Sequence, residues 1–95
     1  MRLSFEAEVF EWRGPAPFYF AAVPESQAKR IREISKIVTY GWGVIPCLVK
    51  VGKTEVSTSL FPKQGGYLVP LKDALRKPEK LTVGTSAKIT LTIDV

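Results

Sequence analysis

Residues 18–24 read Phe18-Tyr19-Phe20-Ala21-Ala22-Val23-Pro24, and residues 66–70 read Gly66-Tyr67-Leu68-Val69-Pro70. Each stretch is an apolar and aromatic run of strand length that ends at a proline, a residue well tolerated in the first turn of a helix. A segment with helical character, a glycine and a β-rich run follow each proline, with Gly43 in the first half and Gly84 in the second. The pattern of strand, proline, helix, glycine and strand therefore occurs twice, which indicates a degenerate internal repeat.

The segments after the two prolines predict helices. From Glu25 to Ile37, apolar residues recur every three to four positions, the spacing of an amphipathic helix. Residues 71–77 predict a shorter helix with Asp73 in its first turn and Arg76 in its last, where the charges complement the helix dipole. We expect both helices to be short elements in a domain composed mainly of strands.

The other segments carry strand patterns. Residues 3–12 and 87–93 alternate apolar and polar side chains, as strands with one buried face do. Gly52-Lys53 separates the predicted strands 44–51 and 54–60, and a two-residue Gly-X loop predicts a type II′ hairpin.

The remaining segments are a further strand and two connectors. The run 18–23 has no charged residue, so we expect a strand that is buried on both faces. Residues 39–43 predict a glycine-rich turn and 61–66 a connector before a short strand at 66–69. Six strands in two similar halves predict a mainly β fold with two short helices. We expect a closed, pseudo-twofold, six-stranded barrel whose ends are plugged by the helices, formed as a single domain by residues 1–95.

Composition excludes several classes of site. The 95 residues include no histidine and one cysteine, which removes the commonest general base, every intrachain disulfide and every Cys-rich metal site. The nine acidic residues show no metal-ligand spacing, and the glycines form no phosphate-binding motif. Cys47 lies in an apolar run, where a packed thiol is the usual outcome. We therefore expect a protein that is not an enzyme and uses neither a cofactor nor a metal.

Charge and targeting signals narrow the setting. The chain carries 14 Lys and Arg against 9 Asp and Glu, and most of the net charge of +5 lies after residue 47. The N-terminal alternation lacks the apolar run of a signal peptide or membrane anchor. We expect a cytoplasmic protein with no membrane partner, and the sequence leaves the oligomeric state open.

Aromatic and basic residues gather around the glycine-rich connectors and the second predicted helix. If these segments meet at one mouth of the barrel, they offer stacking surfaces and cationic donors to a ligand. The alternative is that the aromatic residues fill the barrel core while the cations are solvated. The candidate ligand-binding residues are Tyr40, Trp42, Phe61, Lys63, Tyr67, Lys72 and Arg76.

An ordered set of motifs resembles one known family. The motifs are Phe5-x-Ala7, Phe18-Tyr19-Phe20 with Val23-Pro24, Tyr40-Gly41-Trp42-Gly43, Ser59 to Lys63, Gly65 to Lys72, and Leu75-Arg76-Lys77. Together they span nearly the whole chain and resemble the DUF1905 family of small, mostly bacterial and archaeal domains. The resemblance implies a closed six-stranded Greek-key barrel and no assigned biochemical role. This chain departs from the family at Gly84-Thr85, where the family usually has Gly-Asp, so it lacks the charged group there and we expect no metal or anion-sensitive role for this position.

Two functional hypotheses follow. The first is a non-catalytic binding module that holds a small anionic or aromatic ligand, or a protein segment, at a barrel mouth. The second is weak nucleic-acid binding through the C-terminal Lys and Arg residues, although the sequence carries no readable nucleic-acid signature. Ionic strength separates the two, because phosphate contacts weaken steeply with salt and a pocket ligand does not.

Overall fold

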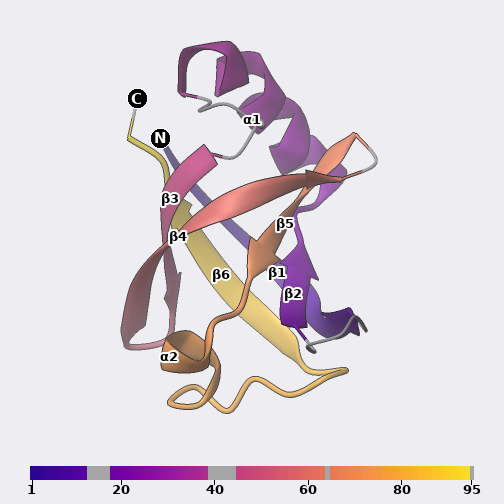
Figure 1. Cartoon of the computed structure of the whole chain (residues 1–95), viewed down its shortest axis with the longest axis vertical. Coiled ribbons are helices and arrows are strands. Elements are labelled where there is room, and N and C mark those ends of the chain that lie inside the picture. Colours follow the sequence, from indigo (N-terminus) through magenta and orange to yellow (C-terminus); the bar gives the residue numbers. More distant parts are fainter. Residues whose placement is uncertain (13–17, 39–44, 64, 95) are drawn as a thin grey trace.

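The structure is a computed structural model that describes residues 1–12, 18–38, 45–63 and 65–94 (Figure 1). The strands described there close into an antiparallel barrel with the order β1-β2-β5-β4-β3-β6. The predicted fold, mainly β with two helices and a closed six-stranded barrel, is therefore confirmed. In chain order the elements are β1 (Arg2–Trp12), β2 (Phe18–Ala22), α1 (Glu25–Val38), β3 (Ile45–Val51), β4 (Thr54–Lys63), β5 (Gly66–Pro70), α2 (Asp73–Arg76) and β6 (Ser86–Thr92).

The strand order has the predicted pseudo-twofold relation. Exchanging β1, β2 and β3 for β4, β5 and β6 leaves every pair of neighbouring strands in the barrel unchanged. Helix α1 follows β2 and helix α2 follows β5, and Figure 1 shows the two helices at opposite ends of the barrel. The repeated pattern of strand, proline and helix therefore corresponds to the two halves of one barrel.

Inward-facing side chains fill the barrel, because every second residue of a strand points to the same face. In β3, the buried residues Ile45, Cys47 and Val49 alternate with exposed neighbours. Each helix also contributes a fully buried side chain, Ile31 from α1 and Leu75 from α2. Burying an aliphatic side chain of this size stabilises the fold by about 1.5–3 kcal/mol, so the helices are anchored through these positions.

The expectation that residues 18–23 are buried on both faces is wrong. Within β2, Ala21 is fully buried, whereas Phe20 is half-buried and Phe18 is 51% exposed. The wall of a barrel has one inner face, and its outer face is buried only where another element covers it. Figure 1 shows the helices at the ends of the barrel, so the outer face of β2 keeps its aromatic side chains in contact with solvent.

Strand β4 runs through the first half of the connector predicted at 61–66. Residues 61, 62 and 63 pair in register with residues 68, 67 and 66 of β5. The connector prediction is therefore wrong for residues 61–63, whereas the predicted start of a strand at Gly66 is confirmed. Pro62 fits in the strand because β3 ends opposite Leu60, so no bond to β3 requires an N–H at this position.

The predicted hairpin at Gly52-Lys53 is confirmed. Val51 pairs with Thr54, and Gly52 has a φ of +58°, as a type II′ turn requires at its first central position.

Helix α2 is shorter than predicted, because Lys72 is still extended with φ −64° and ψ 157°. The turn predicted at 39–43 lies outside the described residues. Neither helix that the structure describes is long and apolar enough to cross a membrane.

Candidate functional site

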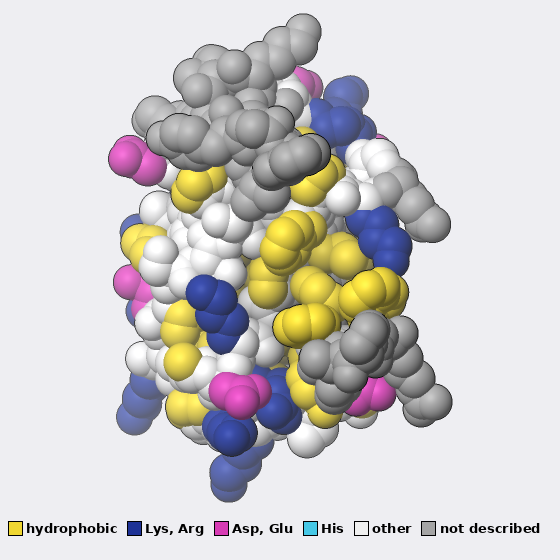
Figure 2. Space-filling view, in the orientation of Figure 1, with side chains coloured by type: hydrophobic (Ala, Val, Ile, Leu, Met, Phe, Trp, Pro, Cys, Tyr) yellow, Lys and Arg dark blue, Asp and Glu magenta, His cyan; other side chains and the backbone are white. Residues whose placement is uncertain are grey.

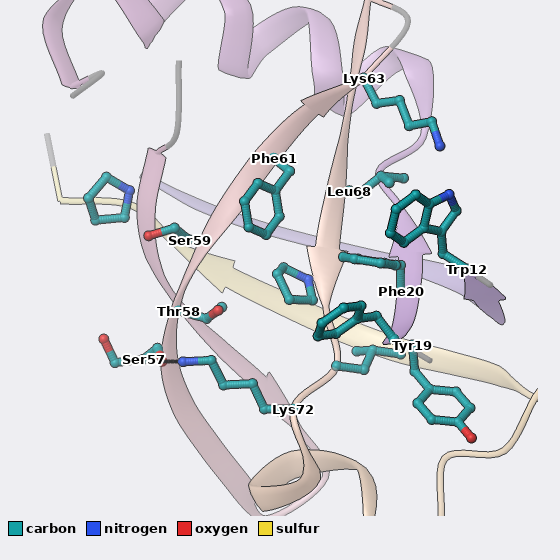
Figure 3. Close-up of a pocket in the computed structure, with 14 residues that line it drawn as sticks. Trp12, Tyr19, Phe20, Ser57, Thr58, Ser59, Phe61, Lys63, Leu68 and Lys72 are labelled. Carbon is teal, nitrogen blue, oxygen red and sulfur yellow. Dashed lines mark hydrogen bonds between the residues drawn. The ribbon is translucent and has the colours of Figure 1, made fainter. Parts of the chain in front are cut away.

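A groove of about 860 Å³ lies on the outer face of the barrel, where β2, β5 and β4 are neighbours. We call it the aromatic groove, and Figure 2 shows its hydrophobic side chains as a group on this face of the molecule. Figure 3 shows that its side chains come from the end of β1, from β2, β3 and β4, from the second half of β5 and from the segment that follows β5. The aromatic groove therefore depends on residues that are far apart in the sequence.

Phe20 is the centre of the aromatic groove. Its ring centroid lies 6.4 Å from that of Phe18 and 6.3 Å from that of Phe61, the latter in an edge-to-face arrangement at 83°. Trp12, Phe18 and Phe61 are 47%, 51% and 45% exposed. Aromatic side chains this exposed and this close together form an apolar surface that can pack against a ligand.

Two lysines border the aromatic groove. The Nζ atom of Lys63 lies 5.8 Å from the centroid of the Trp12 ring, within range of a cation–π interaction. The Nζ atom of Lys72 donates a hydrogen bond to the carbonyl oxygen of Ser57 at 3.1 Å, the dashed contact in Figure 3. The described residues that line the groove include no Asp or Glu, so these cations give it a positive potential.

Arg76 packs against the ring of Tyr19, one of the residues that line the aromatic groove. Its guanidinium carbon lies 4.2 Å from the ring centroid of Tyr19, which lines the groove. Its Nη2 atom also donates to Asp73 Oδ1 at 3.0 Å, and this hydrogen bond holds the pKa of Asp73 below its usual value. Arg76 thus orients Tyr19 and is itself held by Asp73.

The structure divides the residues predicted as a site. Phe61, Lys63 and Lys72 all line the aromatic groove. Arg76 does not line the groove but packs against the ring of Tyr19, which does. Tyr67 points inward from β5 and is 7% exposed, so it belongs to the barrel core, as the alternative interpretation expected. The described members of the set are therefore divided between the outer wall of the barrel and its core, and they do not converge at a barrel mouth.

Two further predicted residues, Tyr40 and Trp42, lie outside the residues that the structure describes. The sequence reasoning also missed residues that do line the groove, above all Trp12, Phe18 and Phe20. For Phe18 and Phe20, the signal in the sequence was the presence of aromatic side chains at alternate positions, which places both on one face of a strand. Since Ala21 takes the inner face of β2, these aromatic residues must face outward.

Among the residues that the structure describes, those lining the groove carry no carboxylate, thiol or imidazole, and no cluster of three or more potential metal ligands is found. The one thiol, Cys47, points into the core and is 6% exposed. Burial raises the pKa of this thiol to about 11 from a usual value of 9.0. A thiol that stays protonated is a poor nucleophile, so Cys47 acts as a small apolar core residue.

The Cys47 thiol makes the stability of the protein depend on pH. Below about pH 9 the thiol is protonated in both states, whereas between 9.0 and about 11 it ionises in the unfolded chain and stays protonated in the folded one. Stability that is present below pH 9 is therefore lost as the pH rises through this window. We expect the free energy of unfolding to fall by about 2 kcal/mol more in the wild type than in Cys47→Ala when the pH is raised from about 8 to about 11.

Chemical denaturation of both proteins at the two pH values measures this difference. The Cys47→Ala variant is the control for the Lys and Tyr residues that titrate in the same range. Equal losses in the two proteins would show that Cys47 ionises as readily in the folded protein as in the unfolded chain.

Comparison with protein families finds a match over most of the chain. The family model DUF1905, described as a domain of unknown function, matches residues 5–91 of this chain. The match includes the last residues of β1 and all of β2, β4 and β5, the strands that form the aromatic groove. No curated protein matches the sequence.

Proposed function

We propose that this chain, which belongs to the DUF1905 family of domains of unknown function, is a non-catalytic binding module whose aromatic groove holds an apolar or aromatic ligand with a negative charge. The observation that carries the proposal is the exposure of the groove's aromatic side chains beside two lysines, with no acidic residue among the described residues that line it. A protein gains nothing in stability by leaving three large aromatic residues about half exposed, and such surfaces mark binding sites. The aromatic faces supply contact area, and the lysines select for charge.

The proposal places binding, and not catalysis, in the aromatic groove because of the residue types that line it. Proton transfer near neutral pH usually needs an imidazole, a carboxylate or an activated thiol within reach of the substrate. The described lining residues offer hydroxyls, aromatic rings and the ammonium groups of Lys63 and Lys72. Those groups can orient a ligand and neutralise its charge.

Binding of 8-anilinonaphthalene-1-sulfonate, an aromatic anion whose fluorescence rises in apolar surroundings, tests the proposal. We expect saturable binding to the folded protein and about tenfold weaker binding to the double variant Lys63→Met, Lys72→Met, because two charge contacts are lost. The uncharged analogue N-phenyl-1-naphthylamine should bind both proteins within about twofold, since the aromatic surface is unchanged.

The matched control is the double variant Lys50→Met, Lys88→Met, which has the same change in net charge on a part of the surface outside the aromatic groove. It should bind both probes as the wild type does. An absence of saturable binding, or equal weakening in the two double variants, would contradict the proposal. A single-stranded oligonucleotide titrated at low and physiological salt tests the nucleic-acid alternative, which predicts a steep loss of affinity with salt.

A further inference from the structure

The edge of β4 that faces the aromatic groove is unpaired over part of its length. β4 pairs with β5 only through residues 61–63, whereas it pairs with β3 over residues 54–60. Beyond Leu68, β5 pairs with β2 and leaves β4. Within the part of the chain that the structure describes, Ser57 and Ser59 therefore have a strand partner on one side only, and both line the groove.

The register shows which backbone groups this edge offers. Val51 and Thr54 close a two-residue hairpin, so they form a hydrogen-bonded pair, and bonding to β3 then recurs at every second residue of β4 up to Leu60. In an antiparallel strand the N–H and C=O groups of the residues in between point to the opposite side. Ser57 and Ser59 thus present two donors and two acceptors toward the aromatic groove.

A proline explains why β5 does not pair with this edge. If the register of the last β4–β5 pair, Phe61 with Leu68, continued along both strands, Pro70 would lie opposite Ser59. Pro70 has no N–H to donate to the carbonyl oxygen of Ser59. The chain then leaves the sheet and enters α2. The backbone hydrogen bonds found between described residues outside the regular ladders include none to Ser57 or Ser59.

Lys72 occupies part of this edge in the free protein. Its Nζ atom donates to the Ser57 carbonyl oxygen at 3.1 Å, which satisfies one acceptor that a further strand would otherwise use. A lysine side chain that covers a strand edge also opposes uncontrolled pairing with other strands. If an incoming N–H takes over the Ser57 carbonyl, the Lys72 ammonium is released beside the groove and can pair with a carboxylate.

We propose that the ligand of the aromatic groove is an extended peptide segment, which adds as a strand to Ser57 and Ser59 of β4. This inference rests on the proposed function and names the ligand of the same site. Backbone bonds to β4 hold the segment, and its alternate side chains lie on the outer face beside Phe61 and Phe20. The groove thus selects a segment with apolar or aromatic residues at alternate positions and an acidic residue near Lys72.

Selection from a display library of random eight-residue linear peptides tests this inference. Enriched peptides are synthesised in two N-methylated forms, one blocked at alternate residues of the edge that pairs with β4 and the other blocked at the opposite edge. We expect the first form to lose at least about tenfold in affinity and the second to bind within about threefold of the parent peptide. Amide hydrogen exchange at Ser57 and Ser59 should slow when the peptide binds.

Two variants of the same residue provide the protein-side control. Ser59→Pro removes the edge N–H and should weaken peptide binding at least about tenfold, whereas Ser59→Ala keeps that N–H, loses only the hydroxyl, and should weaken binding by about threefold or less. The N–H of Ser59 has no partner in β3, so the proline costs no bond of the barrel. If Ser59→Pro fails to fold, the N-methylated peptides still decide the question.

The outcomes separate this inference from the proposed function. No enriched peptide, or enriched peptides that bind equally well in both N-methylated forms, would overturn strand addition. If 8-anilinonaphthalene-1-sulfonate still binds in a lysine-dependent manner in that case, the aromatic groove is a site for free aromatic anions and the proposed function stands. If that probe also fails to bind, the proposed function itself is wrong.

Discussion

Replacing Leu75 with alanine is expected to lower the free energy of unfolding by about 3 kcal/mol, the largest effect that we predict for a single substitution. Leu75 is fully buried and is the buried residue of the single-turn helix α2. So short a helix gains little from its own hydrogen bonds, and its place against the barrel depends on this side chain. Equilibrium denaturation with urea, followed by circular dichroism, measures the loss.

The same substitution at Leu48, which is 39% exposed on β3, is the matched control and should cost less than about 1 kcal/mol. Loosening α2 should also affect the groove, because Lys72 and Arg76 adjoin or belong to this helix. Binding of 8-anilinonaphthalene-1-sulfonate to the folded fraction of Leu75→Ala should therefore weaken toward that of the double lysine variant. A cost at Leu75 no larger than at Leu48 would mean that α2 is not anchored in the core.

Phe61→Glu is expected to weaken binding of the same probe on the order of a hundredfold, or about 2.7 kcal/mol. The substitution removes one side of the edge-to-face pair with Phe20 and places a negative charge inside a groove whose described charged residues are lysines. Both changes act against an aromatic anion. Because Phe61 is 45% exposed, the free energy of unfolding should change by about 1 kcal/mol or less.

Two further variants separate the contributions. Phe61→Leu keeps the groove apolar and should weaken binding only about tenfold, so the remaining difference reports the charge. Val83→Glu introduces the same charge at a position that is 57% exposed and outside the groove, and it should leave the affinity unchanged. Wild-type affinity in Phe61→Glu would place the ligand elsewhere on the protein.

The sequence predictions that the structure confirms depend on the conformational preferences of adjacent residues. The repeated strand, proline and helix pattern predicted the barrel because prolines and apolar periodicity act locally, through φ, a missing N–H and the two-residue alternation of strands. Hairpin formation at Gly52-Lys53 is local in the same sense. The aromatic set at 18 and 20 was assigned to the interior, since an apolar run by itself does not show whether a second layer covers the strand.

The composition of the site was predictable only in part. Phe61 and Lys63 were identified because they lie in the connector that follows the fourth predicted strand, and Lys72 because it lies on the second predicted helix. These three residues do lie together. Tyr67 was grouped with them although it points inward. The distinction depends on strand register, because a shift of one residue exchanges the two faces of a strand.

By itself, the sequence determined that the chain forms a mainly β barrel in two similar halves, that no histidine is present for acid–base chemistry, and that positive charge is concentrated after residue 47. Only the tertiary structure decided that Phe20 and Phe61 lie side by side on the outer wall and that β4 and β5 part beyond Phe61, which leaves Ser57 and Ser59 without a second strand. The physical reason is that alternation and proline effects depend on adjacent residues. The position of an uncovered face depends on strand order around the closed barrel and on which surfaces the two helices cover.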